Sequence, residues 1–421
     1  MRVIHAHKYF HLADGASRHE YELMGLERAH GITTIPFAMH APNNLSSPWE
    51  EYWTPNLDTS AVGKNIGAVK QLSSAWYNRS AERNFTRLIK DTHPNIIHAH
   101  NLYTHLSYSP LVVAKKFDLP VVMTIHDFGF WSANYGCWNT RLEQPLSTSA
   151  GFWSTANSRF IKNSFVATAT LELIVRLKRF FGQSINLVDR FLVSSEFMRG
   201  FMIAHGINQE RIKVIPLFTT VGQSSIGQSI VGQSARKTAN KNNNFAERSG
   251  VLFVGRLEGY KGVTDFIGVA VANPQLKFTV IGAGPLKGEL ELAVKSLKNL
   301  TFLGRASNEE VITAMGKTRI LYLPSLWPET FGLTALEGMA LGAVVVANSV
   351  GGLAGQIKDG QNGRLVTPGK LEEASALIAL LHEDKIVWEQ LSAGGILHAQ
   401  THGDPDQYVE AVDRLYKGLV G

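Results

Sequence analysis

The sequence predicts an α/β protein built from two parallel-sheet, Rossmann-like domains that face each other across a cleft. Three observations lead to this prediction. The chain has 421 residues, which is too long for one ordinary compact core and suggests two or three domains. Short apolar runs alternate with helical patterns in both halves, and strands separated by helices pair in parallel. A polar low-complexity tract at residues 219–249 separates the two halves.

The strands are predicted where short apolar runs occur. They cover Val3–Ala6, Thr33–Phe37, Ile96–Ala99, Val121–Ile125 and Arg190–Ser194 in the first half, then Gly250–Val254, Lys277–Ile281, Leu300–Leu303, Arg319–Leu323 and Ala343–Ala347. The helices are predicted at Arg18–Ala29, Ser80–Lys90 and Leu111–Phe117, then at Gly262–Val271, Leu286–Leu297, Asn308–Met315, Thr334–Ala340 and Lys370–Leu381. The ligand crevice of such sheets lies at the carboxyl ends of the strands.

The tract at 219–249 contains three Gly-Gln-Ser units, which start at Gly222, Gly227 and Gly232 and precede an Asn/Lys-rich stretch. Such a composition buries too little apolar area to offset the entropy lost on ordering. We therefore expect a flexible linker or expanded loop rather than a functional repeat.

This boundary gives an N-terminal domain at 1–218 and a C-terminal domain at 250–403. The last segment, 404–421, is predicted to be an amphipathic helix that packs back on the N-terminal domain. Asp404 suits the N-cap of this helix and Pro405 its first turn.

Composition excludes several classes of protein. Lys and Arg number 41 against 35 Asp and Glu, and the net charge of +6 is mild for this length, so no nucleic-acid partner is predicted. The single cysteine, Cys137, excludes an intramolecular disulfide and a Cys-cluster metal site. No secretory signal pattern and no apolar run of about 20 residues occurs. We expect a cytoplasmic protein that is soluble or peripherally attached to a membrane.

The stretch from Ser325 to Met339 carries two carboxylates, Glu329 and Glu337, around a strand-to-helix turn. Unpaired N–H groups at a helix start favour an anion such as a phosphate. Two carboxylates beside such a site fit a hydroxyl-rich ligand, because an ionised carboxylate only accepts hydrogen bonds. The alternative is that both glutamates are solvated surface residues.

Two cations follow the predicted strand that ends at Val254, in the stretch Gly255-Arg256-Leu-Glu-Gly-Tyr-Lys261. Arg256 offers a planar fork and Lys261 a point charge, and together they suit a diphosphate. Taken alone they would be two solvated loop cations. The nearby helix start strengthens the phosphate interpretation.

These motifs resemble a known family. PETFGLTALEGMA with its two glutamates, GRLEGYKG upstream and NSVGGLAGQIKDGQNGRLV downstream are similar to the group 1, family 4 retaining glycosyltransferases of GT-B fold. The similarity is close over 250–368 and looser over 96–127 and 189–216. It implies transfer of a sugar from a UDP- or GDP-type donor. The C-terminal domain would bind the donor and the N-terminal domain the acceptor.

The resemblance also implies roles for residues of the C-terminal domain. Arg256 and Lys261 would bind the donor diphosphate, Glu337 the ribose hydroxyls and Glu329 the sugar hydroxyls. The backbone amides of Phe331, Gly332 and Leu333 would contact the sugar and phosphate, and the turn Gly304-Arg305 would seat the base.

In the N-terminal half, His126 ends a buried strand, where the resemblance places it beside the donor sugar. It is the catalytic-pocket candidate, together with Arg256, Lys261 and Glu329, and would act by hydrogen bonding; the alternative is a structural histidine. Gly15 and Ala16 occupy the place of the family's glycine-rich acceptor loop, although Ala16 replaces the second glycine. Asp127 is assigned to the same acceptor side.

Neither a metal nor a cofactor is predicted. His98-Ala-His100 has the spacing of strand ligands, but no third ligand is evident and we expect a strand end. Asp404-Pro-Asp406 matches an Asp-x-Asp metal motif, but its place at a helix start favours capping. A dinucleotide fingerprint would need a glycine where Lys287 stands, so no NAD site is expected.

The segment 158–182 holds five Lys/Arg against one Glu, interleaved with apolar residues. Two interpretations stay open: a basic amphipathic helix that docks on an anionic membrane, or a helix packed on the N-terminal domain with a solvated basic face.

The resemblance thus implies a hexosyltransferase with a nucleotide-sugar donor and a glycan or polyprenyl-linked acceptor, acting in cell-surface polysaccharide biosynthesis. No carboxylate is an obvious nucleophile, which favours front-face transfer. Two alternatives are a nucleotide-sugar epimerase of the same fold and a non-catalytic protein that binds a sugar nucleotide or a polyanion.

Overall fold

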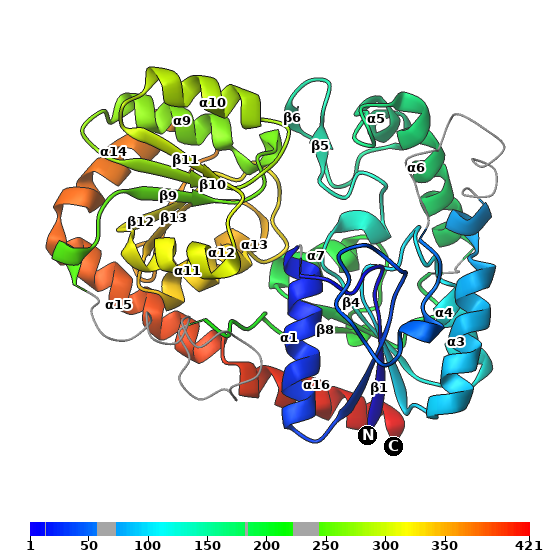
Figure 1. Cartoon of the computed structure of the whole chain (residues 1–421). Coiled ribbons are helices and arrows are strands. Elements are labelled where there is room, and N and C mark those ends of the chain that lie inside the picture. Colours follow the sequence, from blue (N-terminus) through cyan, green and yellow to red (C-terminus); the bar gives the residue numbers. More distant parts are fainter. Residues whose placement is uncertain (13, 57–72, 182–183, 222–243) are drawn as a thin grey trace.

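The structure is a computed structural model that describes residues 1–421 except 13, 57–72, 182–183 and 222–243. The Gly-Gln-Ser units, most of the tract 219–249 and Gly182 lie outside the described residues. Two α/β domains lie side by side, and the last helix lies beneath the sheet of the N-terminal domain (Figure 1). Among the described residues, no helix is long and apolar enough to span a lipid bilayer.

The N-terminal domain is built on a parallel six-stranded sheet of order β2-β1-β3-β4-β7-β8. Its strands are β1 (Arg2–Ala6), β2 (Thr33–Phe37), β3 (Ile96–Ala99), β4 (Val121–Thr124), β7 (Arg190–Val193) and β8 (Ile212–Val214). Its main helices are α1 (Gly15–Ala29), α3 (Arg79–Thr92), α4 (Ser109–Lys116) and α7 (Glu196–Ala204). All five predicted strands are confirmed, whereas β8 and α7 were not predicted.

Helix α1 begins three residues earlier than the apolar pattern predicts. The side chain of Asp14 accepts a hydrogen bond from the backbone N–H of Ser17, and the Ser17 hydroxyl binds the Asp14 N–H in return. This capping box starts the helix at Gly15. Gly15 and Ala16 therefore form the first turn of α1 rather than a loop before it.

The C-terminal domain has a parallel six-stranded sheet of order β11-β10-β9-β12-β13-β14. The strands are β9 (Val251–Val254), β10 (Phe278–Ile281), β11 (Leu300–Gly304), β12 (Ile320–Leu323), β13 (Val344–Asn348) and β14 (Arg364–Val366). The helices are α9 (Val263–Ala272), α10 (Lys287–Ser296), α11 (Asn308–Lys317), α12 (Leu333–Ala340), α13 (Gly351–Gln356), α14 (Leu371–Glu383) and α15 (Lys385–His402). The strand order reverses between β9 and β12, which is where such sheets bind ligands.

Successive residues of the central strands enter different cores, as the two-residue period of a strand requires. In β13, Val344 and Val346 pack into one core of the C-terminal sheet, and Val345 and Ala347 pack into the other. Both faces of the sheet are thus buried, which explains why this strand is apolar throughout.

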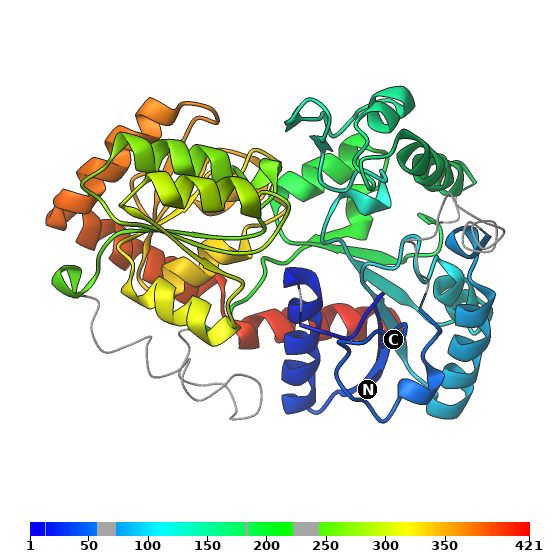
Figure 2. The ribbon, with the colours of Figure 1, turned by 45° about the horizontal axis from the view of Figure 1, so that its top comes forward.

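Helix α16 (Pro405–Val420) belongs physically to the N-terminal sheet. Tyr408, Val409, Val412 and Tyr416 are buried in the same core as residues of β1, β3 and α1. Asp404 caps the helix by accepting from the N–H of Gln407, so the capping interpretation of Asp404-Pro-Asp406 is confirmed. In both Figure 1 and Figure 2 this red helix follows α15 from the C-terminal domain to the underside of the other domain.

The segment 158–182 is only partly helical, which corrects the prediction of one amphipathic helix. Helix α6 spans Phe165–Phe180 with Ser164 as its N-cap, and residues 158–163 precede it as turns. It packs beside α5 (Phe152–Asn157). A short hairpin of β5 (Trp138–Asn139) and β6 (Gln144–Pro145) precedes these two helices in the chain. Lys178 is buried, and its ammonium group donates to the carbonyl oxygens of Ala75 and Tyr103. This residue is therefore part of the interior and not of a basic face.

Gly262, between β9 and α9, occupies a position that excludes any side chain. Its φ is +73°, and a Cβ atom there would lie 1.9 Å from the carbonyl oxygen of Pro324. The close approach joins the loop after β9 to the loop after β12.

Gly262→Ala should lower the free energy of unfolding by at least about 2 kcal/mol, because it adds both backbone strain and a clash. Gly288→Ala is the matched control, since Gly288 lies in α10 with nothing within 4 Å of its would-be Cβ. Urea denaturation of both variants measures the difference; equal stabilities would contradict this account.

Candidate active site

A cleft of about 1080 Å³ lies between the two domains, and the carboxyl ends of both sheets open into it. The N-terminal side is lined by residues that follow β1, β3 and β4 and by the start of α1, and the C-terminal side by residues that follow β9, β11 and β12. Figure 2 shows the two domains side by side. The predicted site residues that line the cleft are Gly15, Ala16, His126, Asp127, Arg256, Lys261, Arg305, Glu329, Phe331, Gly332, Leu333 and Glu337. Gly304 is set back from the lining and accepts a hydrogen bond from the N–H of Gly282.

Glu329 and Lys261 form an ion pair on the C-terminal side of the cleft. The Lys261 ammonium lies 2.6 Å from Glu329 Oε1, and the Ser325 hydroxyl donates to the same oxygen at 2.8 Å. Burial raises the pKa of Glu329, but Lys261 and these hydrogen bonds outweigh burial and hold it below the ordinary value. Glu329 is thus an ionised acceptor at neutral pH, with a cation beside it.

The start of α12 faces the cleft directly after Glu329. Gly332 has a φ of +97°, and a Cβ atom there would lie 2.4 Å from Leu353, so the sharp turn into the helix requires glycine. Among the described residues, no side chain caps this helix start. Its first N–H groups lack intrahelical partners and offer a site for an anion.

Arg256 and Arg305 add positive charge to the same side. The Arg256 guanidinium lies 5.4 Å from the centre of the Tyr260 ring, which orients it at the end of β9. Both arginines line the cleft, as Lys261 does. The C-terminal side can therefore neutralise a polyanion with three cations and one helix start.

Glu337 is bound across the cleft by Arg18, a residue that the sequence analysis missed. Arg18 lies in α1, and its guanidinium is 2.7 Å from Glu337 Oε1 and donates to Asn308 of α11 at 3.0 Å. It also forms an ion pair with Glu22 at 2.9 Å. Arg18 thus connects the start of the N-terminal domain with two helices of the other domain, and a ligand that binds Glu337 must share or displace it.

On the N-terminal side, His126 and Asp127 lie opposite Glu329. Burial lowers the pKa of His126 to about 4, so the ring is neutral at pH 7, and burial raises the pKa of Asp127. The Thr330 hydroxyl donates to the backbone oxygen of His126 at 3.0 Å. The two halves of the predicted site are therefore in direct contact.

Asp14 and Lys8 line the N-terminal edge of the cleft together with the start of α1. Burial raises the pKa of Asp14, but Lys8 and the N–H of Ser17 outweigh it, and the pKa is about 2. Lys8 lines the cleft and was not identified from the sequence. A lone lysine two residues after a strand gives no signal that distinguishes it from a solvated one.

His98 and His100 have a third histidine beside them, which corrects the expectation that no third ligand exists. Possible ligand atoms of His5, His98 and His100 lie within 4.8 Å of one another, and all three residues are buried. Each of the six ring nitrogens has a hydrogen-bond partner, however: Glu27, Tyr416, Thr124, His126, or a ring within the group. The cluster is a hydrogen-bonded network whose lone pairs are already used.

Lys261→Met should destabilise the fold by about 3 kcal/mol at pH 7, because it leaves the Glu329 carboxylate buried without its cation. In the wild type the folded-state pKa of Glu329 is depressed, so its stabilising contribution is present at neutral pH and is lost as pH falls through that pKa. Without Lys261, burial raises the pKa of Glu329, and protonation of Glu329 at acidic pH removes its buried charge. The loss of stability caused by Lys261→Met should therefore become smaller as pH falls from 7 to 4.

Urea denaturation across this pH range measures the effect, and the double variant Lys261→Met/Glu329→Gln is the control that should recover much of the stability. A pH-independent loss of stability would contradict the assignment.

Two family models match the chain. Residues 13–220 match the model described as Glycosyltransferase Family 4, and residues 234–398 match the model described as Glycosyl transferases group 1. An uncharacterized glycosyltransferase of Methanocaldococcus jannaschii is 36% identical over 140 residues, which are 32% of this chain and 39% of that protein. An uncharacterized 42.6 kDa protein in the cps region of Klebsiella pneumoniae is 25% identical over 346 residues, 78% of this chain and 79% of that protein. The chain covers 39 to 52% of the length of the first curated relatives that it matches.

The fold has solved counterparts. The structure of HepE from Anabaena in complex with UDP and glucose superimposes with a TM-score of 0.62 at 16% identity, covering 99% of this chain and 100% of that one. At this identity the likeness concerns the fold, and it agrees with the two six-stranded parallel sheets and the interdomain cleft described above. The chain has the GT-B fold and belongs to the group 1, family 4 glycosyltransferases.

Proposed function

We propose that the chain transfers a sugar from a UDP- or GDP-type nucleotide sugar to a glycan or polyprenyl-linked glycan, with retention of anomeric configuration. The observation that carries the proposal is the Lys261–Glu329 pair beside the uncapped start of α12, facing the neutral His126 across the cleft. A cation and a helix start suit a diphosphate, while an ionised carboxylate next to them suits sugar hydroxyls. HepE, whose structure holds UDP and glucose, supports the same ligand class.

The charge that develops on the leaving diphosphate would be stabilised by Arg256, Lys261 and the N–H groups at the start of α12. None of the carboxylates in the cleft is needed as a covalent nucleophile in this scheme, so transfer occurs on the face from which the diphosphate leaves. Closure of the cleft around the bound donor would expel water that would otherwise hydrolyse it. Because protein cations perform the neutralisation, we propose that transfer needs no metal ion and that EDTA leaves the rate unchanged.

The acceptor would enter from the side of Asp14, Gly15, Ala16 and Asp127. A role in cell-surface polysaccharide biosynthesis is supported by the similarity to a protein in the cps region of Klebsiella pneumoniae. This role is compatible with a protein that works in the cytoplasm, next to the membrane that holds a lipid-linked acceptor.

Glu329→Gln and Lys261→Ala should each reduce transfer at least about 100-fold, because each removes a charge that contacts the donor. Lys287→Ala is the matched control, since Lys287 is exposed on α10 and pairs only with Glu291 among the described residues. A radiolabelled panel of UDP- and GDP-sugars with and without a polyprenyl-linked glycan measures transfer. Turnover of the donor to a new free sugar nucleotide without acceptor would support an epimerase instead, and near-normal transfer by Glu329→Gln would refute the proposed site.

A second proposal concerns the membrane. The outer face of α6 is apolar and exposed: Val166 is 67%, Leu173 49% and Phe180 82% accessible, and Trp153 of the neighbouring α5 is 69% accessible. Exposed Arg159 precedes the helix. Apolar anchors with a cation beside them suit the interface of an anionic bilayer, and the apolar face replaces the basic face that the sequence suggested.

Val166→Ser/Phe180→Ser should weaken binding to vesicles of phosphatidylcholine and phosphatidylglycerol about 10-fold or more, because two anchors are lost. Leu380→Ser/Ile386→Ser is the control, with two similarly exposed apolar side chains on α14 and α15 of the other domain. Vesicle co-sedimentation compares the two double variants with the wild type. Equal binding by all three proteins would contradict the membrane proposal.

A further inference from the structure

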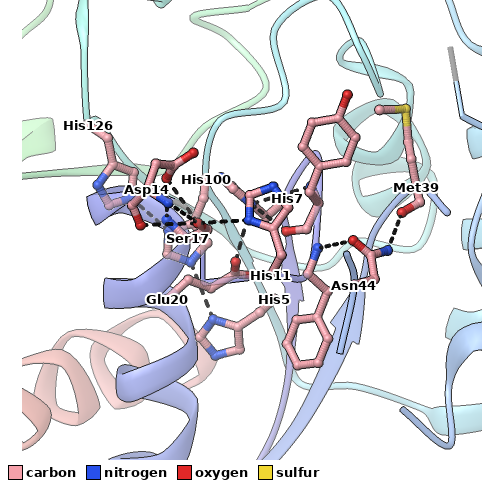
Figure 3. A network of polar contacts seen from close by, with 12 residues as sticks. His5, His7, His11, Asp14, Ser17, Glu20, Met39, Asn44, His100 and His126 are labelled. Carbon is pink, nitrogen blue, oxygen red and sulfur yellow. Dashed lines mark hydrogen bonds and ion pairs between the residues drawn. The ribbon is translucent and has the colours of Figure 1, made fainter. Parts of the chain in front are cut away.

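A row of buried polar side chains leads from α1 across the N-terminal sheet to the cleft. Glu27 of α1 lies 2.6 Å from Nε2 of His5 on β1, Nδ1 of His5 lies 3.3 Å from Nε2 of His100 after β3, and Nδ1 of His100 lies 3.1 Å from Nε2 of His126 after β4. Glu27, His5 and His100 are fully buried. Figure 3 shows the three histidines with the hydrogen bonds that link them. We call this row the histidine relay.

The direction of each hydrogen bond in the relay follows from its first member. Glu27 accepts at Oε1 from the Tyr416 hydroxyl at 3.0 Å, and its other oxygen is available to accept from Nε2–H of His5. A neutral imidazole has one N–H and one lone pair. With a single proton on His5, held on Nε2 by Glu27, Nδ1 of His5 accepts from Nε2–H of His100, and Nδ1 of His100 accepts from Nε2–H of His126.

The rings beyond His5 are neutral at physiological pH. Burial, and then the neighbouring histidines, lower the pKa of His100 well below its ordinary value, and burial lowers the pKa of His126 to about 4. With its proton held on Nε2, His126 keeps a lone pair on Nδ1. Within the part of the chain that the structure describes, no hydrogen bond uses this nitrogen, and His126 lines the cleft.

We propose that Glu27, His5 and His100 are positioning residues that hold His126 as the Nε2–H tautomer, so that its Nδ1 accepts a hydrogen bond from a hydroxyl group of the bound sugar or acceptor. The inference deepens the proposed function and rests on it for the identity of the ligand. The relay itself is a property of the ligand-free protein. It also explains why three histidines and a glutamate are buried together: each fixes the proton of the next.

The test uses Glu27→Gln, which keeps the size of the side chain and changes its hydrogen-bonding groups. The amide oxygen of the new glutamine accepts the hydrogen bond from the Tyr416 hydroxyl, so its NH₂ group faces His5 and donates to Nε2. Every bond of the relay then reverses, and His126 becomes the Nδ1–H tautomer, which donates into the cleft instead of accepting.

Glu20→Gln is the matched control. Glu20 is also buried on α1, but it contacts His7 at 3.4 Å and is not a member of the relay. Burial raises the pKa of Glu20 well above its ordinary value. Glu20→Gln therefore changes a buried carboxyl group of α1 without touching a member of the relay.

Long-range ¹H–¹⁵N NMR of histidine-labelled protein without ligand reads the tautomers, with His126 assigned by the signals lost in His126→Gln. We expect a protonated Nε2 in the wild type and in Glu20→Gln, and a protonated Nδ1 in Glu27→Gln. Sugar transfer by Glu27→Gln should fall at least about 10-fold in kcat, while its affinity for UDP or GDP alone stays unchanged, because His126 faces the sugar rather than the nucleotide.

A wild-type His126 with its proton on Nδ1 would overturn the proposal, even if Glu27→Gln did not fold. An unchanged tautomer in folded Glu27→Gln would overturn it as well. If the tautomers behave as expected but no sugar nucleotide is turned over, the relay stands and only the proposed function fails.

Discussion

The geometry of the cleft depends on the contacts of one residue, Thr330. Its hydroxyl donates to the backbone oxygen of His126 after β4, and its own carbonyl oxygen accepts from the hydroxyls of Ser195, at 2.6 Å, and Ser194 after β7. The turn after β12 is thereby joined to two strand ends of the other domain. Gly352 allows this, because a Cβ atom there would lie 2.5 Å from the Thr330 oxygen.

This anchoring has a chemical consequence, since Glu329 and the start of α12 flank Thr330 in sequence. The contacts that hold Thr330 against His126 therefore also set the position of the Glu329 carboxylate and of the first N–H groups of α12 relative to the opposite domain. Arg18 adds a second crossing, from α1 to Glu337 and Asn308. The site is therefore assembled by interdomain polar contacts, and each domain alone would hold only half of it. Such contacts can break and re-form when a ligand enters or leaves.

The two walls of the cleft respond differently to the burial of their polar groups. Glu329 keeps its charge because Lys261 and Ser325 compensate for burial, while His126 loses its charge because burial outweighs the attraction of the Asp14 carboxylate. The charged Lys261–Glu329 pair on one wall of the cleft thus faces a neutral but hydrogen-bonding His126 on the other. That contrast suits a ligand with a charged diphosphate at one end and neutral hydroxyl groups at the other.

The sequence predicted the parts of this arrangement that are local in the chain. The β12–α12 turn, with Glu329 and Gly332, lies within one short motif, and apolar runs were enough to find ten of the strands. The short edge strands β8 and β14 were missed because three mixed residues give little pattern. Helix α15 was missed because it holds Gly394 and Gly395 in its interior, where glycine disfavours a helix. A Cβ atom at Gly394 would lie 2.0 Å from the Gln361 oxygen, so close packing requires glycine there.

The long-range pairings could not be predicted in this way. Arg18 and Glu337 are 319 positions apart, and the relay joins residues of one helix and three strands that only the sheet order β1-β3-β4 brings together. Amphipathic patterning also failed to show which side of α6 is buried. Both interpretations of segment 158–182 gave it an outward basic face, although the Lys178 ammonium is buried and donates to two backbone oxygens.

The most direct test of the account is a crystal structure of the chain with UDP or GDP, whichever binds in calorimetry. The account predicts the diphosphate between Arg256, Lys261 and the first N–H groups of α12, with the ribose at Glu337 in place of Arg18. A nucleotide bound outside this cleft, or with its diphosphate turned toward the N-terminal domain, would contradict it.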